Sequence, residues 1–392
     1  HGSVGCTPSV TSKASVLQHC TASSEGNSWN SRTESRELSE LGSNVMPRLR
    51  RPNRPTLKDV ASRAGVSPQT VSNYLTGRHA TRAGSRERIE RAIRELDYRP
   101  NAAAQALRSR QSDTIALVLE DPNALGLHEY FHMEFLNGAA EAAHDADQHL
   151  LVTLTRPDET MNLAIRVARE GRADGLALSL GDANAVEPEM RELASVGVPV
   201  VLLQQTSSIA GIATITAQDE VGAAAAVTHL VAHGHRRIAW LCGNELWPGP
   251  ARRFAGVRGA AIAAGITLSE WTCDAYTVEA AHETIAREFR DVASRPTAVI
   301  AANDMIALGV VQQALDQGLD VPEDLSVIGF NDFDFSSWVR PSLTTVRIPA
   351  AAMGRRAVEV LLGAPGGPMP SAPTFNAELV VRESSGPAPA GA

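Results

Sequence analysis

Short apolar runs alternate with stretches of helical spacing from residue 115 onward. A first set of apolar runs lies at 115–119, 149–154, 175–180 and 198–203, with helical stretches such as 132–146 and 160–170. A second set lies at 237–241, 298–302 and 325–330, with helices near 220–233, 252–264, 278–293 and 303–317. Alternation of this kind predicts parallel sheets that carry helices on both faces. Two sets predict two lobes, and the natural ligand site is the cleft between them, at the carboxyl ends of the strands.

Caps and spacing predict three short helices within residues 56–96. Thr56 opens a capping box with the side chain three residues later, and Gly65 ends the helix that follows. Ser67 caps the next helix, in which Pro68 occupies the first position, where its missing N–H costs no hydrogen bond. Two short helices joined by a tight turn that contains glycine form a helix-turn-helix, whose second helix enters the major groove of DNA.

The segments outside these patterns are predicted to lack stable structure of their own. Residues 1–45 are rich in polar residues and glycine and show no periodicity, so we expect disorder, with the methionine at 46 as an alternative start of the native chain. Residues 101–107 have good helix propensity but span only about two turns, so they should fold only when a partner orders them. Residues 384–392 contain no heptad repeat, and we expect a disordered tail and no coiled-coil tetramer.

The formal net charge of −8 conceals a strong asymmetry. Residues 46–112 carry 15 Lys and Arg against 5 Asp and Glu, whereas residues 113–392 carry 18 against 35. A basic module attached to an acidic body is typical of a nucleic-acid binder with a regulatory domain. The alternative for the basic segment is a solvated helical surface without a partner.

Composition and missing motifs exclude several classes of protein. No apolar run approaches the roughly 20 residues that span a bilayer, and the N-terminus lacks the pattern of an export signal. We therefore expect a cytoplasmic, nucleoid-associated protein and not a periplasmic solute-binding protein. The chain contains no phosphate loop, nucleophile elbow, metal-ligand spacing or dinucleotide fingerprint, so we expect no enzyme and no cofactor. The scattered spacing of the cysteines indicates free thiols: Cys6, Cys20, Cys242 and Cys273.

The segment 56–75, TLKDVASRAGVSPQTVSNYL, and the segment 301–309, AANDMIALG, resemble the lactose-repressor/galactose-repressor (LacI/GalR) family. The resemblance is specific over residues 55–111 and looser to about residue 383. It implies a ligand-controlled repressor with a small all-α helix-turn-helix domain. Its α/β effector domain would have two doubly wound, parallel-sheet lobes like those of periplasmic binding proteins. His233-Gly234-His235, which suggests a metal site, then matches the family's helix-to-strand turn, with Gly234 as the C-cap.

The resemblance implies that the start of the second helix reads bases. Gln69 can pair with adenine there, which would contribute about 1–3 kcal/mol of discrimination. Asn73 stands where the family often has arginine, so its reach is shorter and its preferred base should differ. Pro68 can contact a thymine methyl, or serve only as the first residue of the helix. The predicted DNA contacts are Thr56, Ser67, Pro68, Gln69, Thr70, Ser72, Asn73, Tyr98, Asn101, Ala104 and Leu107.

In the family, the segment that corresponds to Asn101–Ser109 is a hinge helix that folds on the operator. The resemblance places Leu107 in the minor groove, beside Ala104, where an apolar wedge kinks the duplex at a cost of a few kcal/mol. Tyr98 and Asn101 correspond to positions that contact the DNA backbone. The alternative for Leu107 is a linker residue without a DNA contact.

For the sensing domain, the resemblance implies five effector contacts: Phe131, Arg253, Tyr276, Asn303 and Asn331. The planar guanidinium of Arg253 suits an effector oxygen, and a surface ion pair is its alternative. Phe131 and Tyr276 fit ligand stacking and simple packing equally well. Asn331 replaces a carboxylate that binds sugar hydroxyls in the family. Because an amide donates as well as accepts, this position allows an uncharged or differently substituted effector.

Gln218–Asp219 and residues 121–130, near the predicted pocket, also depart from the family pattern. The predicted order of domains is a helix-turn-helix domain at 46–100, a hinge and linker at 101–112, and a two-lobed effector and dimerisation domain at 113–383. A single reading head binds weakly, so we expect a homodimer on a pseudopalindromic operator. The expected effector is a small molecule, a sugar or sugar derivative, and no membrane partner is expected.

Overall fold

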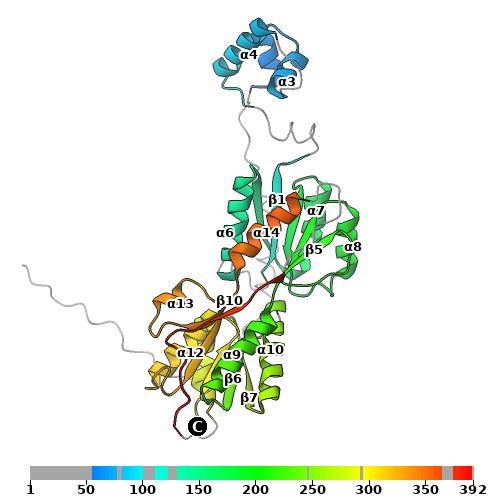
Figure 1. The fold of residues 1–392 in the computed structure, drawn as a ribbon. Helices are drawn as coiled ribbons and strands as arrows, with labels where there is room; N and C mark the ends of the chain where they lie inside the picture. Colours follow the sequence, from blue (N-terminus) through cyan, green and yellow to red (C-terminus); the bar gives the residue numbers. More distant parts are fainter. Residues whose placement is uncertain are drawn as a thin grey trace, which may run out of the picture. The chain divides into compact units, whose positions relative to one another are not determined.

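The computed structural model describes residues 55–76, 82–99, 111–121, 130–244, 247–291, 295–363 and 374–390. The chain divides into two compact units, residues 1–99 and residues 100–392 (Figure 1). The extension at 1–45 and residues 101–110 of the predicted hinge lie outside the described residues.

The first unit, the head, contains α2 (Leu57–Ala64), α3 (Pro68–Thr76) and α4 (Ala83–Glu95). The predicted capping box is present: Thr56 N–H donates to Asp59 Oδ2 at 2.7 Å, and Asp59 N–H donates to Thr56 Oγ1 at 3.4 Å. Thr56 N–H and the Thr56 hydroxyl both donate to Asp59 Oδ2, and these two hydrogen bonds lower the pKa of the Asp59 carboxyl. Gly65 ends α2 in the left-handed region, with φ of 63°. The helix-turn-helix prediction is confirmed.

A small apolar core holds the three helices of the head together. Its buried side chains are Val60, Ala61, Ala64, Val71, Ile89, Ala92 and Tyr98. On the surface, the Arg63 guanidinium pairs with the Glu95 carboxylate at 2.6 Å and joins α2 to the end of α4. Both of these side chains are exposed, so the pair adds little, and the core carries the stability of the head.

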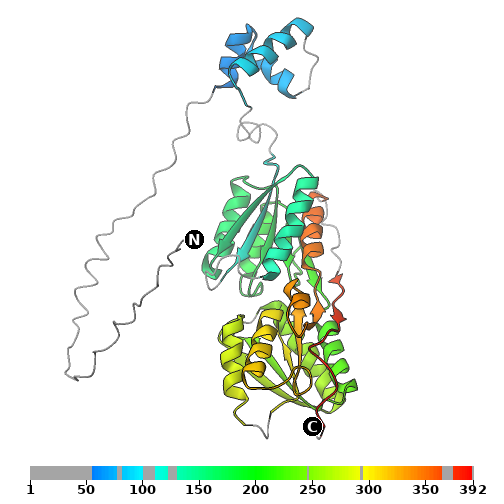
Figure 2. The ribbon, with the colours of Figure 1, turned by 90° about the vertical axis from the view of Figure 1, so that its left-hand side faces the viewer.

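The described residues of the second unit, the body, form two six-stranded sheets (Figure 2 shows helices on both faces of each). The strand orders are β11-β5-β4-β3-β1-β2 and β12-β10-β9-β8-β6-β7. Neighbouring strands are parallel except for β10 and β12. The predicted α/β body with two doubly wound lobes is therefore confirmed.

Each lobe is built mainly from one half of the body sequence. The first lobe contains β1 (Thr114–Glu120), α6 (Tyr130–Asp145), β2 (His149–Thr155), α7 (Pro157–Arg169), β3 (Gly175–Ser179), α8 (Glu187–Ser195), β4 (Val200–Leu203) and β5 (Ile212–Ala217). The second lobe contains α9 (Asp219–Ala232), β6 (Arg237–Gly243), α10 (Pro248–Ala264), β7 (Thr267–Cys273), α11 (Val278–Glu288), β8 (Ala298–Ala301), α12 (Asp304–Asp316), β9 (Ser326–Asn331), α13 (Phe335–Trp338) and β10 (Thr344–Arg347). The chain then adds α14 (Ala350–Leu362) and β11 (Thr374–Phe375) to the first lobe, and β12 (Glu378–Val380) to the second.

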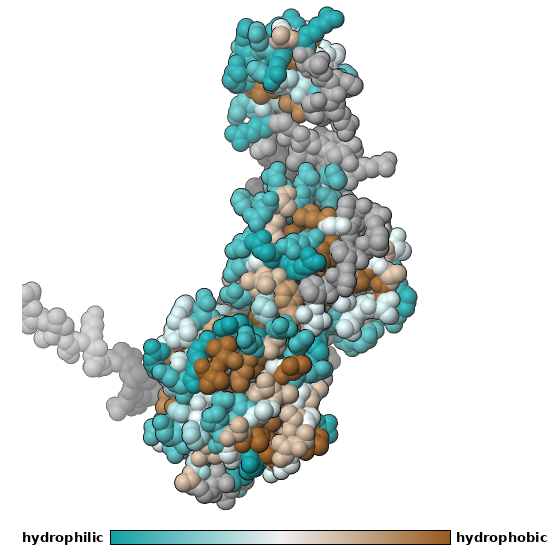
Figure 3. All heavy atoms as spheres, viewed as in Figure 1, coloured by the Kyte–Doolittle hydropathy of each residue, from teal (hydrophilic) through white to brown (hydrophobic). Residues whose placement is uncertain are grey.

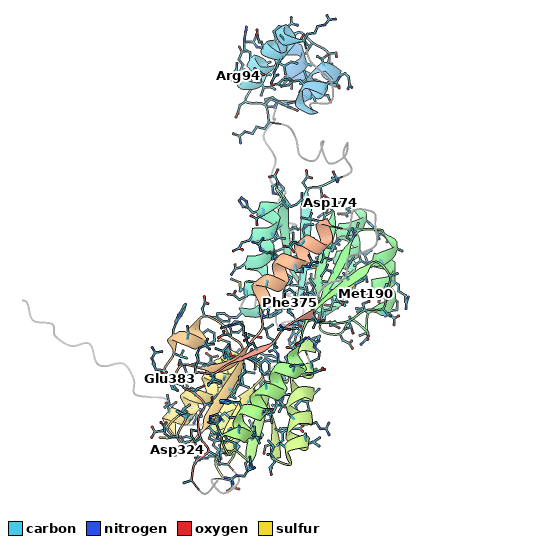
Figure 4. The ribbon with its side chains drawn as sticks, in the orientation of Figure 1. Arg94, Asp174, Met190, Asp324, Phe375 and Glu383 are labelled. Carbon is cyan, nitrogen blue, oxygen red and sulfur yellow. The ribbon has the colours of Figure 1, made fainter. Side chains whose placement is uncertain are left out.

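Within the ranges that the structure describes, the chain crosses between the lobes three times, through one or two residues each time. Gln218 joins β5 to α9, residues 348–349 join β10 to α14, and residues 376–377 join β11 to β12. Gln218 N–H donates to the Phe375 carbonyl at 2.8 Å, which ties the first crossing to the third. Figure 4 shows Phe375 at the junction of the lobes.

Helices α6 and α14 lie side by side in the first lobe (Figures 1 and 2). A Cβ atom at Gly138 would lie 1.8 Å from the Ala351 carbonyl oxygen, and one at Gly354 would lie 2.0 Å from the Phe135 carbonyl oxygen. Only glycine allows the two backbones to approach this closely. α6 also carries three residues that line the cavity described below, so this contact positions them.

The first described residues of the body are anchored to the first lobe by one carboxylate. Ser112 N–H donates to Asp174 Oδ1 at 2.9 Å, and Asp113 N–H donates to Asp174 Oδ2 at 2.8 Å. Asp174 lies at one end of the first lobe (Figure 4). The end of the segment that leads from the hinge is therefore fixed to this lobe.

The C-terminal segment corrects a prediction, because residues 384–390 are ordered and packed rather than disordered. Val327 N–H donates to the Ser384 carbonyl at 2.7 Å, and the Gly386 carbonyl lies 3.1 Å from His235 Nε2. The small side chains of this segment fit against the second lobe while its backbone supplies the hydrogen bonds, so no apolar periodicity is needed. Residues 391–392 lie outside the described residues.

The His233-Gly234-His235 turn is hydrogen-bonded to this C-terminal segment. Among the described residues, no group of three or more His, Cys, Asp or Glu side chains could hold a metal ion. The C-cap of α9 is His233, one residue before the predicted C-cap, Gly234. Gly234 follows in the left-handed region, with φ of 92°. His235 is fully buried, with Nδ1 2.8 Å from Thr297 Oγ1. Burial lowers the pKa of His235, which favours the neutral ring.

Within the described ranges, Cys242 and Cys273 are free thiols, as predicted, while Cys6 and Cys20 lie outside these ranges. No helix in the same ranges combines the length and the apolar character needed to cross a membrane.

Candidate DNA-binding head and effector pocket

The start of α3 presents polar groups to solvent. Ser67 Oγ accepts from Thr70 N–H at 3.1 Å and caps the helix, and Pro68 is its first residue, as predicted. Gln69 is exposed and donates from Nε2 to Asn73 Oδ1 at 2.9 Å. Because these residues are one turn apart, they form a paired amide surface on one face of α3.

The other predicted DNA contacts differ in exposure. Thr56 is exposed, but its hydroxyl belongs to the capping box of α2. Ser72 is 6% exposed and Tyr98 is 8% exposed, so each offers only a small part of its surface to DNA. Asn101, Ala104 and Leu107 lie outside the described residues.

Exposed arginines add positive charge to the head. Those of α4 and its N-cap are Arg82, Arg86, Arg88, Arg91 and Arg94. Figure 3 shows that hydrophilic side chains cover most of the visible face of the head. A basic, hydrophilic surface beside a helix with exposed amides is suited to phosphates and base edges.

In the body, a cavity of about 170 Å³ is lined by residues of both lobes. It lies at the carboxyl ends of strands that include β1, β3, β8 and β9. All five residues predicted to contact an effector line it: Phe131, Arg253, Tyr276, Asn303 and Asn331. Residues more than 120 positions apart in sequence are thus brought to a single cavity.

Arg253 occupies the floor of this cavity and is only 3% exposed. Its Nη1 donates to the Ala302 carbonyl at 2.7 Å, and its Nη2 donates to Asn331 Oδ1 at 2.9 Å. Its guanidinium carbon lies 4.7 Å from the centroid of the Phe330 ring. These contacts fix the guanidinium plane and rule out the alternative of a surface ion pair.

Sequence reasoning missed the network that holds Arg253. Asp219 is fully buried and accepts from Arg253 Nε at 2.9 Å and from Arg252 Nη2 at 2.7 Å. Arg252 also donates to the Gln204 carbonyl and, at 2.8 Å, to Gln204 Oε1. Gln204 follows β4 of the first lobe in the left-handed region, with φ of 59°. Arg252 therefore joins the two lobes. In the sequence, the unusual Gln218–Asp219 pair was the signal that could have pointed to this network.

Asn303 follows the end of β8 by two residues, and Asn331 is the last residue of β9. Asn303 caps α12, and its Oδ1 accepts from Ile306 N–H at 2.9 Å. Asn331 has φ of 102°, which its short amide side chain tolerates better than most. Next to Asn303, burial raises the pKa of Asp304 to about 7, while Phe333 N–H donates to its carboxylate.

The walls of the cavity combine aromatic rings with a few polar groups. Tyr276 Oη lies 3.3 Å from Cys242 Sγ, and burial raises the pKa of the tyrosine above its ordinary value. His132 Nε2 lies 3.0 Å from Ser179 Oγ, and its ring packs edge-on against Trp247. Glu120 accepts from Gly181 N–H at 3.1 Å, and burial raises its pKa. Sequence reasoning missed His132, Trp247 and Glu120, for which no local pattern gave a signal.

Comparisons with known proteins agree with both units. Residues 56–101 match the model described as "Bacterial regulatory proteins, lacI family", and residues 227–385 match a "Periplasmic binding protein-like domain". The catabolite control protein A of Priestia megaterium is 30% identical over 310 residues, covering 78% of this chain and 91% of that protein. The ribose operon repressor of Escherichia coli (strain K12) is 31% identical over 314 residues, covering 78% and 92%.

Among solved structures, the lac repressor dimer bound to operator and the anti-inducer ONPF gives a TM-score of 0.75 at 28% identity. The match covers 85% of this chain and 99% of that chain. The similarity thus extends over the head and both lobes, and the chain belongs to the LacI family of bacterial regulatory proteins.

Proposed function

We propose that this regulator represses transcription by binding operator DNA as a homodimer, and that a small molecule held between the lobes controls its operator affinity. The observation that carries the proposal is a cavity lined by both lobes, with a fixed and buried Arg253, in a chain that has a basic helix-turn-helix head. We assign residues 46–100 to DNA binding, 101–112 to the hinge and 113–383 to effector binding and dimerisation. The similar proteins are named as regulators, which supports a regulatory rather than an enzymatic role.

Contact with both lobes gives a ligand the means to control DNA binding. A ligand that fits one orientation of the lobes better shifts the equilibrium toward it. The Asp174 anchor at Ser112 and Asp113 would carry that change to the hinge segment. A coupling of about 1–3 kcal/mol would change occupancy by roughly 5–150 fold.

The similar structures support the partners in this proposal. The lac repressor structure is a dimer on operator DNA, and the regulator CelR, 29% identical with a TM-score of 0.60, was solved with cellobiose. A two-fold dimer presents two heads to a pseudopalindrome, and its symmetry sets the spacing of the half-sites.

Replacing Gln69 with alanine is expected to relax base choice at one operator position and to cost about 1–3 kcal/mol on the cognate sequence. Gln69 is the exposed amide of the Gln69–Asn73 pair, so its loss removes a base contact and the hydrogen bond to Asn73. The measurement is binding to a set of operators that differ at single base pairs. Arg91→Ala, on the exposed face of α4, is the control and should weaken binding to all sequences alike. Equal losses on cognate and scrambled DNA for Gln69→Ala would contradict a base-reading role.

Replacing Arg253 with alanine is expected to abolish the effector response while DNA binding persists. Asp219 would still be paired with Arg252, so the fold tolerates the loss. The check is operator affinity measured with and without the effector, with Arg258→Ala as the control, because Arg258 is exposed on the same helix. A normal response in Arg253→Ala would remove this residue from the site.

A further inference from the structure

The floor of the cavity, formed by Arg253, Asn303 and Asn331, is rich in hydrogen-bond donors. The protein partners of the two asparagine side chains show which way each amide group is turned. A guanidinium cannot accept a hydrogen bond, so the contact with Arg253 Nη2 must be made by Asn331 Oδ1. A backbone N–H cannot accept either, so the contact with Ile306 must be made by Asn303 Oδ1. In both side chains the amide oxygen therefore accepts a hydrogen bond from the protein, and the NH₂ group faces away from that contact.

Both NH₂ groups reach the cavity. Asn303 is 4% exposed and Asn331 is 6% exposed, and both line the cavity. In the described part of the chain, neither Nδ2 atom has a hydrogen-bond partner, and neither is fully buried. Each amide therefore offers N–H donors to a ligand. Arg253 adds the N–H groups of Nη1 and Nη2 that its protein contacts leave over, since a guanidinium has five.

The charge around this floor is positive. Arg252 and Arg253 share the single carboxylate of Asp219, so one positive charge of the three groups is not balanced. Asp304 does not line the cavity, and its carboxylate accepts from Phe333 N–H, Ser336 Oγ and Thr345 Oγ1. A donor-rich floor with excess positive charge favours an oxyanion over a hydroxyl, because charge-assisted hydrogen bonds are the stronger kind.

The first lobe, by contrast, lines the cavity with two carboxylates, Glu120 and Asp121. The Glu120 carboxylate accepts from Gly181 N–H at 3.1 Å and hydrogen-bonds the Thr160 side chain. Because a carboxylate has about four acceptor sites, these contacts leave acceptor capacity for ligand hydroxyls. A carboxylate in this position would repel an anionic group, so the acidic end of a ligand would face Arg253. A cavity of roughly 150 Å³ holds one benzene molecule. The cavity here, about 170 Å³, is thus the size of a one-ring ligand or an open chain of similar volume.

We propose that the effector is a hydroxylated carboxylic acid of single-sugar size, a sugar acid. Arg253, Asn303 and Asn331 bind its carboxylate, and Glu120 binds a hydroxyl at the other end. This inference rests on the proposed function, because it names the chemical class of the molecule that the cavity senses. A neutral sugar with the same ring carries a CH₂OH group in place of the carboxylate. This group is not attracted by the excess positive charge and accepts from fewer of the donors, so the site binds the acid more tightly than the neutral sugar.

The test compares matched pairs of ligands on the full-length protein by calorimetric titration at constant ionic strength. The pairs are glucuronate with glucose, galacturonate with galactose, and gluconate with glucitol. At least one acid is expected to bind about tenfold or more tightly than its neutral partner, a difference of about 1.4 kcal/mol. Asn331→Asp replaces the NH₂ donors with a negative charge, so it should weaken the binding of that acid by at least a similar factor. The control Asn162→Asp adds the same charge at an exposed site on α7 and should bind like the wild type.

Three results would overturn the inference: no acid binds, a neutral partner binds as tightly as its acid, or Asn331→Asp binds the acid unchanged. Unliganded melting temperature and DNA binding of each preparation report whether the variant has folded. Wild-type protein that prefers an operator over random DNA but ignores every acid would leave the proposed function standing and sink only this inference. Wild-type protein without any preference among duplexes would instead sink the proposed function.

Discussion

Replacing Asp219 with alanine is expected to lower the free energy of unfolding of the body by about 3–5 kcal/mol, because it leaves buried positive charge without a partner. The cost falls mainly on Arg253, whose side chain is 4% exposed, whereas that of Arg252 is 25% exposed and remains partly hydrated. Urea unfolding followed by tryptophan fluorescence measures the change. The same variant should lose effector binding, since the Arg253 guanidinium plane would no longer be fixed.

The matched control for Asp219 is Glu187, a carboxylate at an exposed ion pair with Arg191 on α8. Glu187→Ala should change the free energy of unfolding by less than about 0.5 kcal/mol, because such pairs are well solvated. Asp219→Asn keeps hydrogen-bonding capacity without the charge and should fall between the two. A loss below about 1 kcal/mol for Asp219→Ala would show that water reaches the Arg253 guanidinium, contrary to its burial.

Gly354→Ala is expected to destabilise the first lobe by about 1–3 kcal/mol or more, although glycine to alanine within a helix ordinarily stabilises by up to about 1 kcal/mol. The new Cβ would lie 2.0 Å from the Phe135 carbonyl oxygen, so α14 and α6 must move apart. That movement would displace Phe131 and His132 at the start of α6 and weaken effector binding. Thermal unfolding with and without effector measures both results.

Gly259→Ala on α10 is the control for Gly354→Ala, because nothing lies within 4 Å of a Cβ atom at Gly259. The sign of the change therefore separates the two sites: a gain of stability is expected at Gly259 and a loss at Gly354. A gain at both positions would mean that the α6–α14 contact is looser than described.

Local signals in the sequence were sufficient for the head. The Thr56 capping box, the left-handed Gly65 and the Ser67–Pro68 start of α3 each depend on residues within one helical turn. Such contacts are present in the sequence pattern itself. The family resemblance then identified residues that line the cavity, which periodicity alone does not select.

The parts that could not be predicted depend on distant partners. β7 is an edge strand whose residues alternate irregularly between exposed and partly buried, so it contains no continuous apolar run. The segment 384–390 is ordered by backbone hydrogen bonds to residues more than 40 positions earlier. Asp219 gains its role only because α10 brings two arginines to it across 33 and 34 positions.

The brevity of the three crossings between the lobes limits how the body can move. Any change in the angle between the lobes must be absorbed by backbone rotation at Gln218 and at residues 348–349 and 376–377. The ring of Pro349 removes one of these rotations. Ile348 N–H also donates to the Asn331 carbonyl at 3.3 Å, so one pivot is bonded directly to a residue of the cavity. Substitutions at these few pivots should therefore tune the stiffness of the sensor while leaving its ligand chemistry unchanged.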